Sequence, residues 1–168
     1  MLKRRLRGSL FRTTILSVLV LSMAATVAAS DSRRLRTDLR GSNEVPPADP
    51  DGRGKATVWI DLEDNEVCFE FSFDDAGTPN RGHIHRGPPG VNGPIEVTFF
   101  ELVGMPDDPR NDQLERRSRL SGCAEDVPTA LLNEIKANPS AFYVNLHNAR
   151  FPGGMIRGQL GMSGGDDD

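Results

Sequence analysis

The sequence contains few of the residues and motifs that most enzymes rely on. Its 168 residues include only two cysteines, one tryptophan, one tyrosine and three histidines. No nucleophile elbow, phosphate-binding loop or glycine-rich dinucleotide motif is present. The two cysteines also lack the Cys-x-x-Cys spacing of a thiolate metal site. The sequence therefore gives no indication of an enzyme, and we expect none.

A second absence is an apolar run long enough to cross a membrane, which takes roughly 20 residues. The longest apolar stretch, residues 15–27, is interrupted by Ser17, Ser22 and Thr26. It follows a basic start and ends in small residues, with Val27 and Ala29 at the −3 and −1 positions of a cleavage site before Ser30. This order is typical of a signal peptide, whereas the alternative is a membrane anchor. We predict that residues 1–29 are cleaved and that the protein is secreted to the periplasm or the cell exterior, with no membrane span left after cleavage.

Positive charge is also scarce once the signal peptide is removed. Residues 1–29 contain five basic residues and no acidic one, so the mature chain keeps 15 of the 20 basic and all 24 acidic residues, a formal charge of −9. Such a chain repels nucleic acid and anionic lipid. We expect neither as a partner, and predict instead an unknown extracellular ligand or protein.

The two cysteines of the mature chain are Cys68 and Cys123. Two cysteines in an oxidising compartment most simply form a disulfide, so we predict a Cys68–Cys123 bridge. The alternative is a pair of buried free thiols.

The remaining pattern is that of short strands separated by Gly, Pro, Asp and Asn. The clearest is 66–74, where Phe69, Phe71 and Phe73 alternate with polar residues, as in a half-buried strand. We predict strands at 35–39, 55–62, 66–74, 81–86, 95–102, 114–123, 141–148 and 155–160. The expected core residues are Phe69, Phe71, Phe73, Val97, Phe99, Phe142, Val144 and Leu146. Residues 104–112 are expected to form a mobile loop.

One segment has helical periodicity instead. Leu131, Leu132 and Ile135 form an apolar stripe after Pro128, and Asp126 can cap the helix N-terminus. We therefore predict a mainly β fold: an antiparallel, Greek-key-like sandwich or barrel of about eight strands with one short helix at 128–136. This domain spans residues 30–160 and is followed by a flexible acidic tail at 161–168.

All three histidines lie on two predicted strands. His83 and His85 are two residues apart, so their side chains point to the same face, and His147 lies on another strand. Three imidazoles that converge suit copper or zinc. The alternative is that they pack or bind loops through hydrogen bonds. The sequence thus makes His83, His85 and His147 candidate ligands of a metal, without an evident fourth ligand.

Four ordered motifs resemble those of the CHRD domain. Residues 39–47 resemble its opening L-x-G-x-x-E-V-P-P, and residues 83–87 its central H-I-H-x-G. Residues 143–147 and 152–160 resemble its closing Y-V-N-V-H and P-x-G-E-I-R-G-Q-L. The family is named after chordin, an extracellular antagonist of bone morphogenetic proteins, and also occurs in secreted microbial proteins. Two positions depart from the pattern: Asn148 replaces a usual Thr, and Met155 replaces a usual Glu beside Arg157.

The resemblance implies a β-sandwich-like domain with no established enzyme activity, which favours a secreted binding or structural module. It covers about residues 35–160, nearly the whole mature chain. If its motifs meet in the fold, Glu44 and Asn145 are candidates to orient an imidazole. Arg157 is a candidate ligand contact too, although its charge suits an anion or an acidic partner better than a metal.

Overall fold

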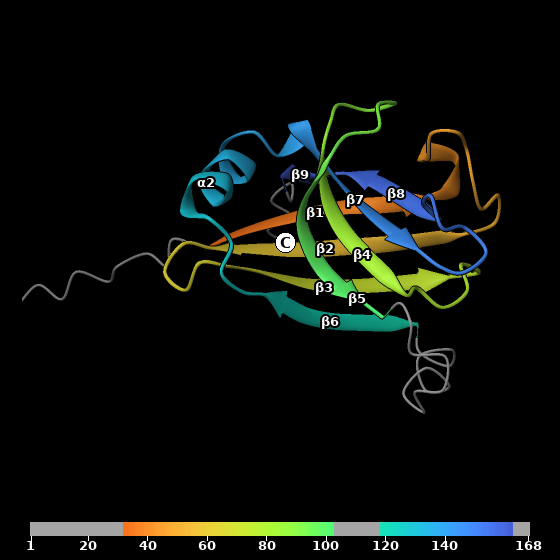
Figure 1. Ribbon diagram of the computed structural model, residues 1–168, viewed down its shortest axis with the longest axis horizontal. Coiled ribbons are helices and arrows are strands. Elements are labelled where there is room, and N and C mark those ends of the chain that lie inside the picture. Colours follow the sequence, from red (N-terminus) through yellow and green to blue (C-terminus); the bar gives the residue numbers. More distant parts are fainter. Residues whose placement is uncertain (1–31, 103–117, 163–168) are drawn as a thin grey trace, which may run out of the picture.

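The computed structural model describes residues 32–102 and 118–162 (Figure 1). The predicted signal peptide, the predicted mobile loop, residues 114–117 of the sixth predicted strand and residues 163–168 of the tail lie outside these ranges. Among the described residues, no helix is long and apolar enough to cross a membrane.

The described chain forms one antiparallel sheet that is nearly closed into a barrel (Figure 1). Its strands are β1 (Arg33–Arg40), β2 (Arg53–Asp61), β3 (Glu66–Asp74), β4 (Arg81–Arg86), β5 (Ile95–Glu101), β6 (Arg119–Ala124), β7 (Phe142–His147), β8 (Ile156–Gln159) and β9 (Gly161–Met162). The order in space is β5-β4-β7-β8-β1-β2-β3-β6, and β9 pairs with β1. This confirms the predicted antiparallel β fold with about eight strands and one helix. Because β9 pairs with β1, the sheet extends into the segment predicted as a tail.

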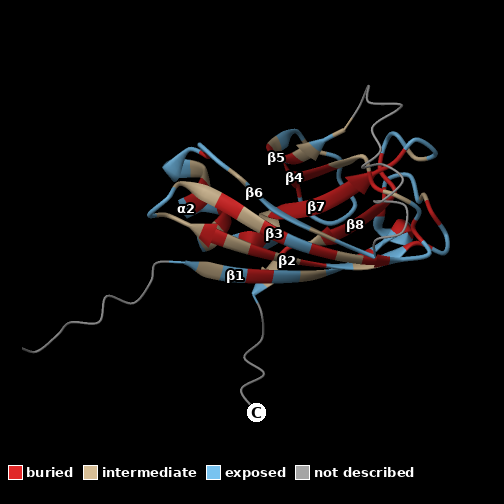
Figure 2. Ribbon diagram, turned by 90° about the horizontal axis from the view of Figure 1, so that it is seen from below, coloured by how far each residue is buried: buried red, intermediate tan, exposed pale blue. Residues whose placement is uncertain are grey.

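The barrel interior is filled by the side chains that the period-two pattern placed inside. All eight predicted core residues are buried. Phe69 and Phe71 of β3 reach across to Phe99 of β5, with ring centroids 4.7 and 5.3 Å apart. Along β2 and β3, buried positions alternate with half-buried or exposed ones, and along β1 Leu35 and Leu39 are buried between exposed neighbours (Figure 2). These three strands therefore have one face in the core and one face toward solvent.

The predicted disulfide is present, because Cys68 of β3 lies directly opposite Cys123 of β6. The bond links residues 55 positions apart in the sequence and joins β6, the last strand in the spatial order, to β3. Because both sulfurs are in the disulfide, no thiolate is available beside the Glu66 carboxylate to bind a metal.

The helix α2 (Thr129–Ala137) covers one end of the barrel and buries Leu132 and Ile135 (Figure 1). The expected N-cap was wrong: the N-cap residue is Pro128, and Asp126 has a left-handed backbone with φ 56°. A residue before proline avoids the helical region, so the helix cannot begin until after Val127. Val127 instead donates its N–H to Asn65 O, which ties the segment to the β2–β3 turn.

Strand β7 differs from β1, β2 and β3 because all six of its residues are buried. Phe142, Val144 and Leu146 face the core, as predicted. Tyr143, Asn145 and His147 face the other way, yet they are covered too. Contacts to that face come from the β1–β2, β4–β5 and β7–β8 connections. The fold therefore encloses a second, polar layer beneath these loops.

Candidate metal centre

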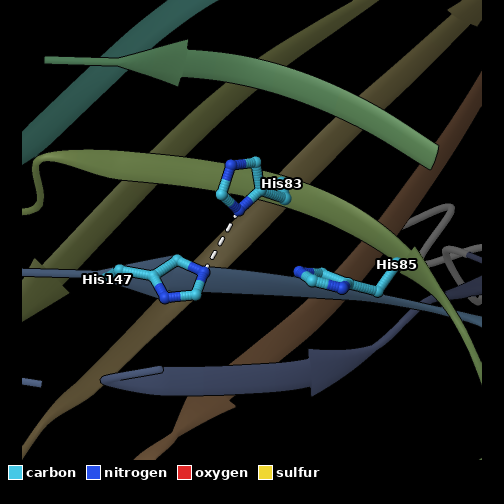
Figure 3. Close-up of side chains that lie close together, drawn as sticks. All are labelled: His83, His85 and His147. Atoms are coloured by element: carbon cyan, nitrogen blue, oxygen red, sulfur yellow. Dashed lines mark hydrogen bonds between the residues drawn. The ribbon is translucent and has the colours of Figure 1, made fainter. Parts of the chain in front are cut away.

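The three histidines come together on this polar side of the sheet. Strands β4 and β7 pair with His83 opposite Asn145 and His85 opposite Tyr143, so the predicted convergence of the two segments occurs. The Nδ1 of His83 lies 3.1 Å from the Nε2 of His147 (Figure 3). One ligand nitrogen from each of the three histidines lies within 4.8 Å of the others. All three residues are buried, with 3% to 9% of their surface exposed.

Backbone carbonyls fix which nitrogen of two rings carries the proton. His85 Nδ1 lies 3.0 Å from Gly93 O, and His147 Nδ1 lies 3.1 Å from Pro152 O. Since a carbonyl can only accept a hydrogen bond, both Nδ1 atoms are donors, and both Nε2 atoms keep a lone pair when the rings are neutral. His147 Nε2 then accepts from His83 Nδ1–H. His85 Nε2 is buried and has no hydrogen-bond partner.

The surroundings keep the rings neutral. Burial lowers the pKa of His83 to about 4, and the nearby His147, His85 and Arg81 add to this effect. Burial likewise lowers the pKa of His147 to about 4, against the opposing hydrogen bond to Pro152. The pKa of His85 is lowered by burial and by the charge of Arg157. Neutral imidazole is the form that binds a metal ion.

Tyr143 and Arg157 hold His85 in place. The His85 ring stacks on Tyr143 with centroids 4.8 Å apart and planes 4° apart, and the Arg157 guanidinium lies 3.3 Å from the Tyr143 ring centroid. Arg157 also donates to Asn92 Oδ1 at 3.0 Å, to Val91 O and to Pro88 O. These acceptors belong to the β4–β5 loop, which supplies the Gly93 carbonyl that orients His85. The described contacts of Arg157 are thus with the loop and with Tyr143, and only its charge acts on His85.

Glu44 and Asn145 form a second buried contact beside the cluster. Asn145 Nδ2 donates to both carboxylate oxygens of Glu44, at 2.8 and 2.9 Å. Burial raises the pKa of Glu44 to about 7, although the Arg157 charge and the Asn145 hydrogen bond oppose the shift. Gly154 closes this pair, since its φ is +141° and an added Cβ would lie 2.5 Å from Glu44 Oε2. Asn145 stands opposite His83, but neither it nor Glu44 has a hydrogen bond to an imidazole among the contacts the structure gives.

The two departures from the family pattern lie in contact with each other. Asn148 Nδ2 donates to Met155 Sδ at 2.8 Å and to Ala76 O at 3.2 Å. Met155 is fully buried. A buried Glu at this position would add a charge that needs a partner, whereas methionine and asparagine satisfy each other here.

Sequence reasoning missed two residues of the site, Arg81 and Tyr143. Within residues 32–102 and 118–162, four buried side-chain atoms lack a hydrogen-bond partner: Asn80 Oδ1, Arg81 Nε, His85 Nε2 and Asn145 Oδ1. All four belong to β4, the residue before it, or β7. Buried polar atoms are nearly always paired with protein or with water, so this concentration makes β4 and β7 the candidate place for a bound group. Arg81 was detectable, because it precedes His83 by two residues and so shares its face.

We expect the metal-free protein to lose stability as the pH falls from 6.5 toward about 4. The pKa of His83 and His147 falls to about 4 on folding, so the unfolded state binds more protons in this range and is favoured by acid. With the opposing contribution of Glu44 included, the net loss should be on the order of 2–3 kcal/mol, measured by urea denaturation of chelator-treated protein.

Glu44 provides the control for this pH dependence. Its raised pKa means that the folded state binds the extra proton between pH 4.5 and about 7, which opposes the histidine effect. Glu44→Gln removes the opposing contribution, so stability should fall more steeply on acidification in this variant than in the wild type. Equal stability at pH 7 and pH 4.5 in both proteins would contradict the assignment of neutral buried histidines.

The fold and the site together define a class: a disulfide-linked antiparallel β-barrel domain with a buried histidine cluster beneath its loops. Comparison with known proteins adds the family. The CHRD domain model matches residues 35–160, three quarters of the chain, and the protein belongs to the CHRD domain family. No curated protein and no solved structure gives a significant match. CHRD domains are generally extracellular and are not a known enzyme family, and the disulfide is typical of an oxidising compartment.

Proposed function

We propose that this protein is a secreted, non-catalytic CHRD module that binds one copper or zinc ion through His83, His85 and His147. The observation that supports this most is the buried, unpartnered Nε2 of His85 beside the other two rings. Its proton lies on Nδ1, so Nε2 offers a lone pair that no group of the described chain uses. A metal ion or a hydrogen-bond donor would satisfy it, and the neighbouring imidazoles favour the metal.

The spacing of the nitrogens supports the same proposal. Metal–nitrogen bonds of about 2.0–2.1 Å place the ligand nitrogens of one ion roughly 3–4 Å apart. His83 Nδ1 and His147 Nε2 are already 3.1 Å apart, and the third nitrogen lies within 4.8 Å. An ion would replace the proton that these two rings share, after which the His83 proton sits on Nε2. A small rotation of His85 completes the set.

The hydrogen bonds around the cluster suit metal ligands as well. Metal-bound histidines usually donate their other N–H to a carbonyl or carboxylate, which fixes the ring orientation. Gly93 O and Pro152 O do this for His85 and His147. In this proposal Arg157 positions His85 through the β4–β5 loop, and the Glu44–Asn145 pair supports β7 next to His83. The partner of the module is an extracellular ligand or protein whose identity the site does not specify.

Metal titration tests the proposal. Chelator-treated chain 30–168 should take up one copper or zinc ion, counted by elemental analysis and titrated by calorimetry. His85→Ala and His147→Ala should each weaken binding by at least about 100-fold, since loss of an outer hydrogen-bond partner alone typically costs 10–100-fold.

The acidic C-terminus needs its own control because Asp166, Asp167 and Asp168 can attract cations weakly. A chain that ends at Gly165 should bind the metal as tightly as the wild type. Weak uptake that is equal in wild type and His85→Ala would refute the metal site and leave a binding module without metal.

A further inference from the structure

We propose that the histidine site takes a small monovalent anion as an additional ligand of the metal, held by Arg81. This inference rests on the proposed metal site and names the class of ligand that occupies its open position. From the sequence, Arg157 is the candidate contact for an anionic ligand, and this inference assigns that role to Arg81. The guanidinium of Arg157 instead contacts the β4–β5 loop and Tyr143.

The strand register places Arg81 at the site. Arg81, His83 and His85 alternate along β4, so their side chains share one face, and Arg81 stands directly opposite His147 on β7. The carbonyl of Pro152 accepts from Arg81 at 3.3 Å and from His147 Nδ1 at 3.1 Å. The Arg81 guanidinium and the His147 ring therefore donate to the same carbonyl oxygen and lie next to each other.

Arg81 also has unused hydrogen-bonding capacity. Its Nε is buried without a partner, as is His85 Nε2. A buried N–H of a cation that lacks an acceptor is costly. A purely structural Arg81, which holds the β7–β8 loop against β4, needs only its hydrogen bond to Pro152 O. That role does not explain why Arg81 Nε is buried away from water as well.

The charges complete the argument. Three neutral imidazoles leave a bound Cu²⁺ or Zn²⁺ with its full charge and with at least one open coordination position. Arg81 adds a further positive charge nearby, which by itself disfavours the metal. One anion on the metal that also accepts from Arg81 Nε would reduce this combined positive charge and satisfy the unpaired donor. The burial of His83, 3% exposed, and His147, 7% exposed, restricts the anion to a few atoms.

Azide binding to the Cu²⁺-loaded protein tests the proposal, followed by ligand-to-metal charge-transfer absorption and by electron paramagnetic resonance. Arg81→Gln should raise the azide dissociation constant about tenfold or more, because a charge-assisted hydrogen bond is lost. The same variant should bind Cu²⁺ as tightly as the wild type or more tightly, since a neighbouring cation is gone. A merely structural role of Arg81 would weaken both. Arg81→Lys, which keeps the charge but not the fork, should be intermediate.

Arg36→Gln is the matched control, since it removes one exposed arginine from β1 and should change neither constant. An azide affinity that is equal in wild type and Arg81→Gln, or no azide complex at all, would overturn the anion inference and leave the metal site standing. Failure of the wild type to bind Cu²⁺ would overturn the metal site and the anion inference with it.

Discussion

Replacing Phe71 with alanine is expected to lower the free energy of unfolding by about 3–5 kcal/mol. Phe71 is fully buried in the middle of β3, stacks on Phe69 at 4.8 Å and meets the edge of Phe99 at 5.3 Å. Truncation leaves a cavity that the surrounding strands cannot fill, because they are fixed by hydrogen bonds on both sides of β3. Urea denaturation at pH 7.5 measures the loss.

Glu70→Ala is the matched control for this prediction. Glu70 precedes Phe71 on the same strand but is exposed on the outer face. Its replacement should change stability by no more than about 0.5 kcal/mol. Equal losses in the two variants would mean that the inner and outer faces of β3 are wrongly assigned.

Replacing Arg157 with methionine is expected to cost about 3–4 kcal/mol, since hydrogen bonds to a charged group are lost and buried acceptors remain unpaired. Arg157 is 2% exposed and donates to Asn92, Val91 and Pro88 while it covers the Tyr143 ring. The β4–β5 loop then keeps only the hydrogen bond from Gln159 to Gly87 O among its side-chain hydrogen bonds to β8 that the structure describes. Metal affinity should fall as well, because that loop carries the carbonyl that orients His85. Denaturation and copper titration measure the two effects.

Two further variants test whether the hydrogen-bonding geometry of Arg157, and not merely its positive charge, stabilises the protein. Arg157→Lys keeps the charge but not the planar fork, so it should remain nearly as unstable as Arg157→Met. Arg150→Met removes an exposed arginine that lies 5.1 Å from the ring centroid of Phe151, and should be close to neutral. Wild-type stability in Arg157→Met would show that the loop does not depend on this residue.

The strands were predictable because strand periodicity is local. In β3 every second residue is Val or Phe, and such a pattern buries its apolar face wherever the strand lies. The disulfide was predictable because the sequence has only two cysteines and so only one possible pair. The limits of local reasoning are visible at β7, whose polar residues Tyr143, Asn145 and His147 look like a solvent-facing set. Only the loops that fold over them make that face buried, and no local pattern indicates what covers a strand.

The same division holds for the site. The sequence by itself determined that His83 and His85 share a face, because alternate residues of a strand point the same way. It also made His147, on another strand, the third candidate ligand. Only the tertiary structure decided that β4 and β7 are neighbours, which brings together residues 64 positions apart. It also decided that Gly93 and Pro152 orient two of the rings, that burial keeps the imidazoles neutral, and that Arg81 Nε lies buried without an acceptor. These properties depend on long-range strand pairing and on exclusion of water, and neither is encoded in the spacing of residues along one strand.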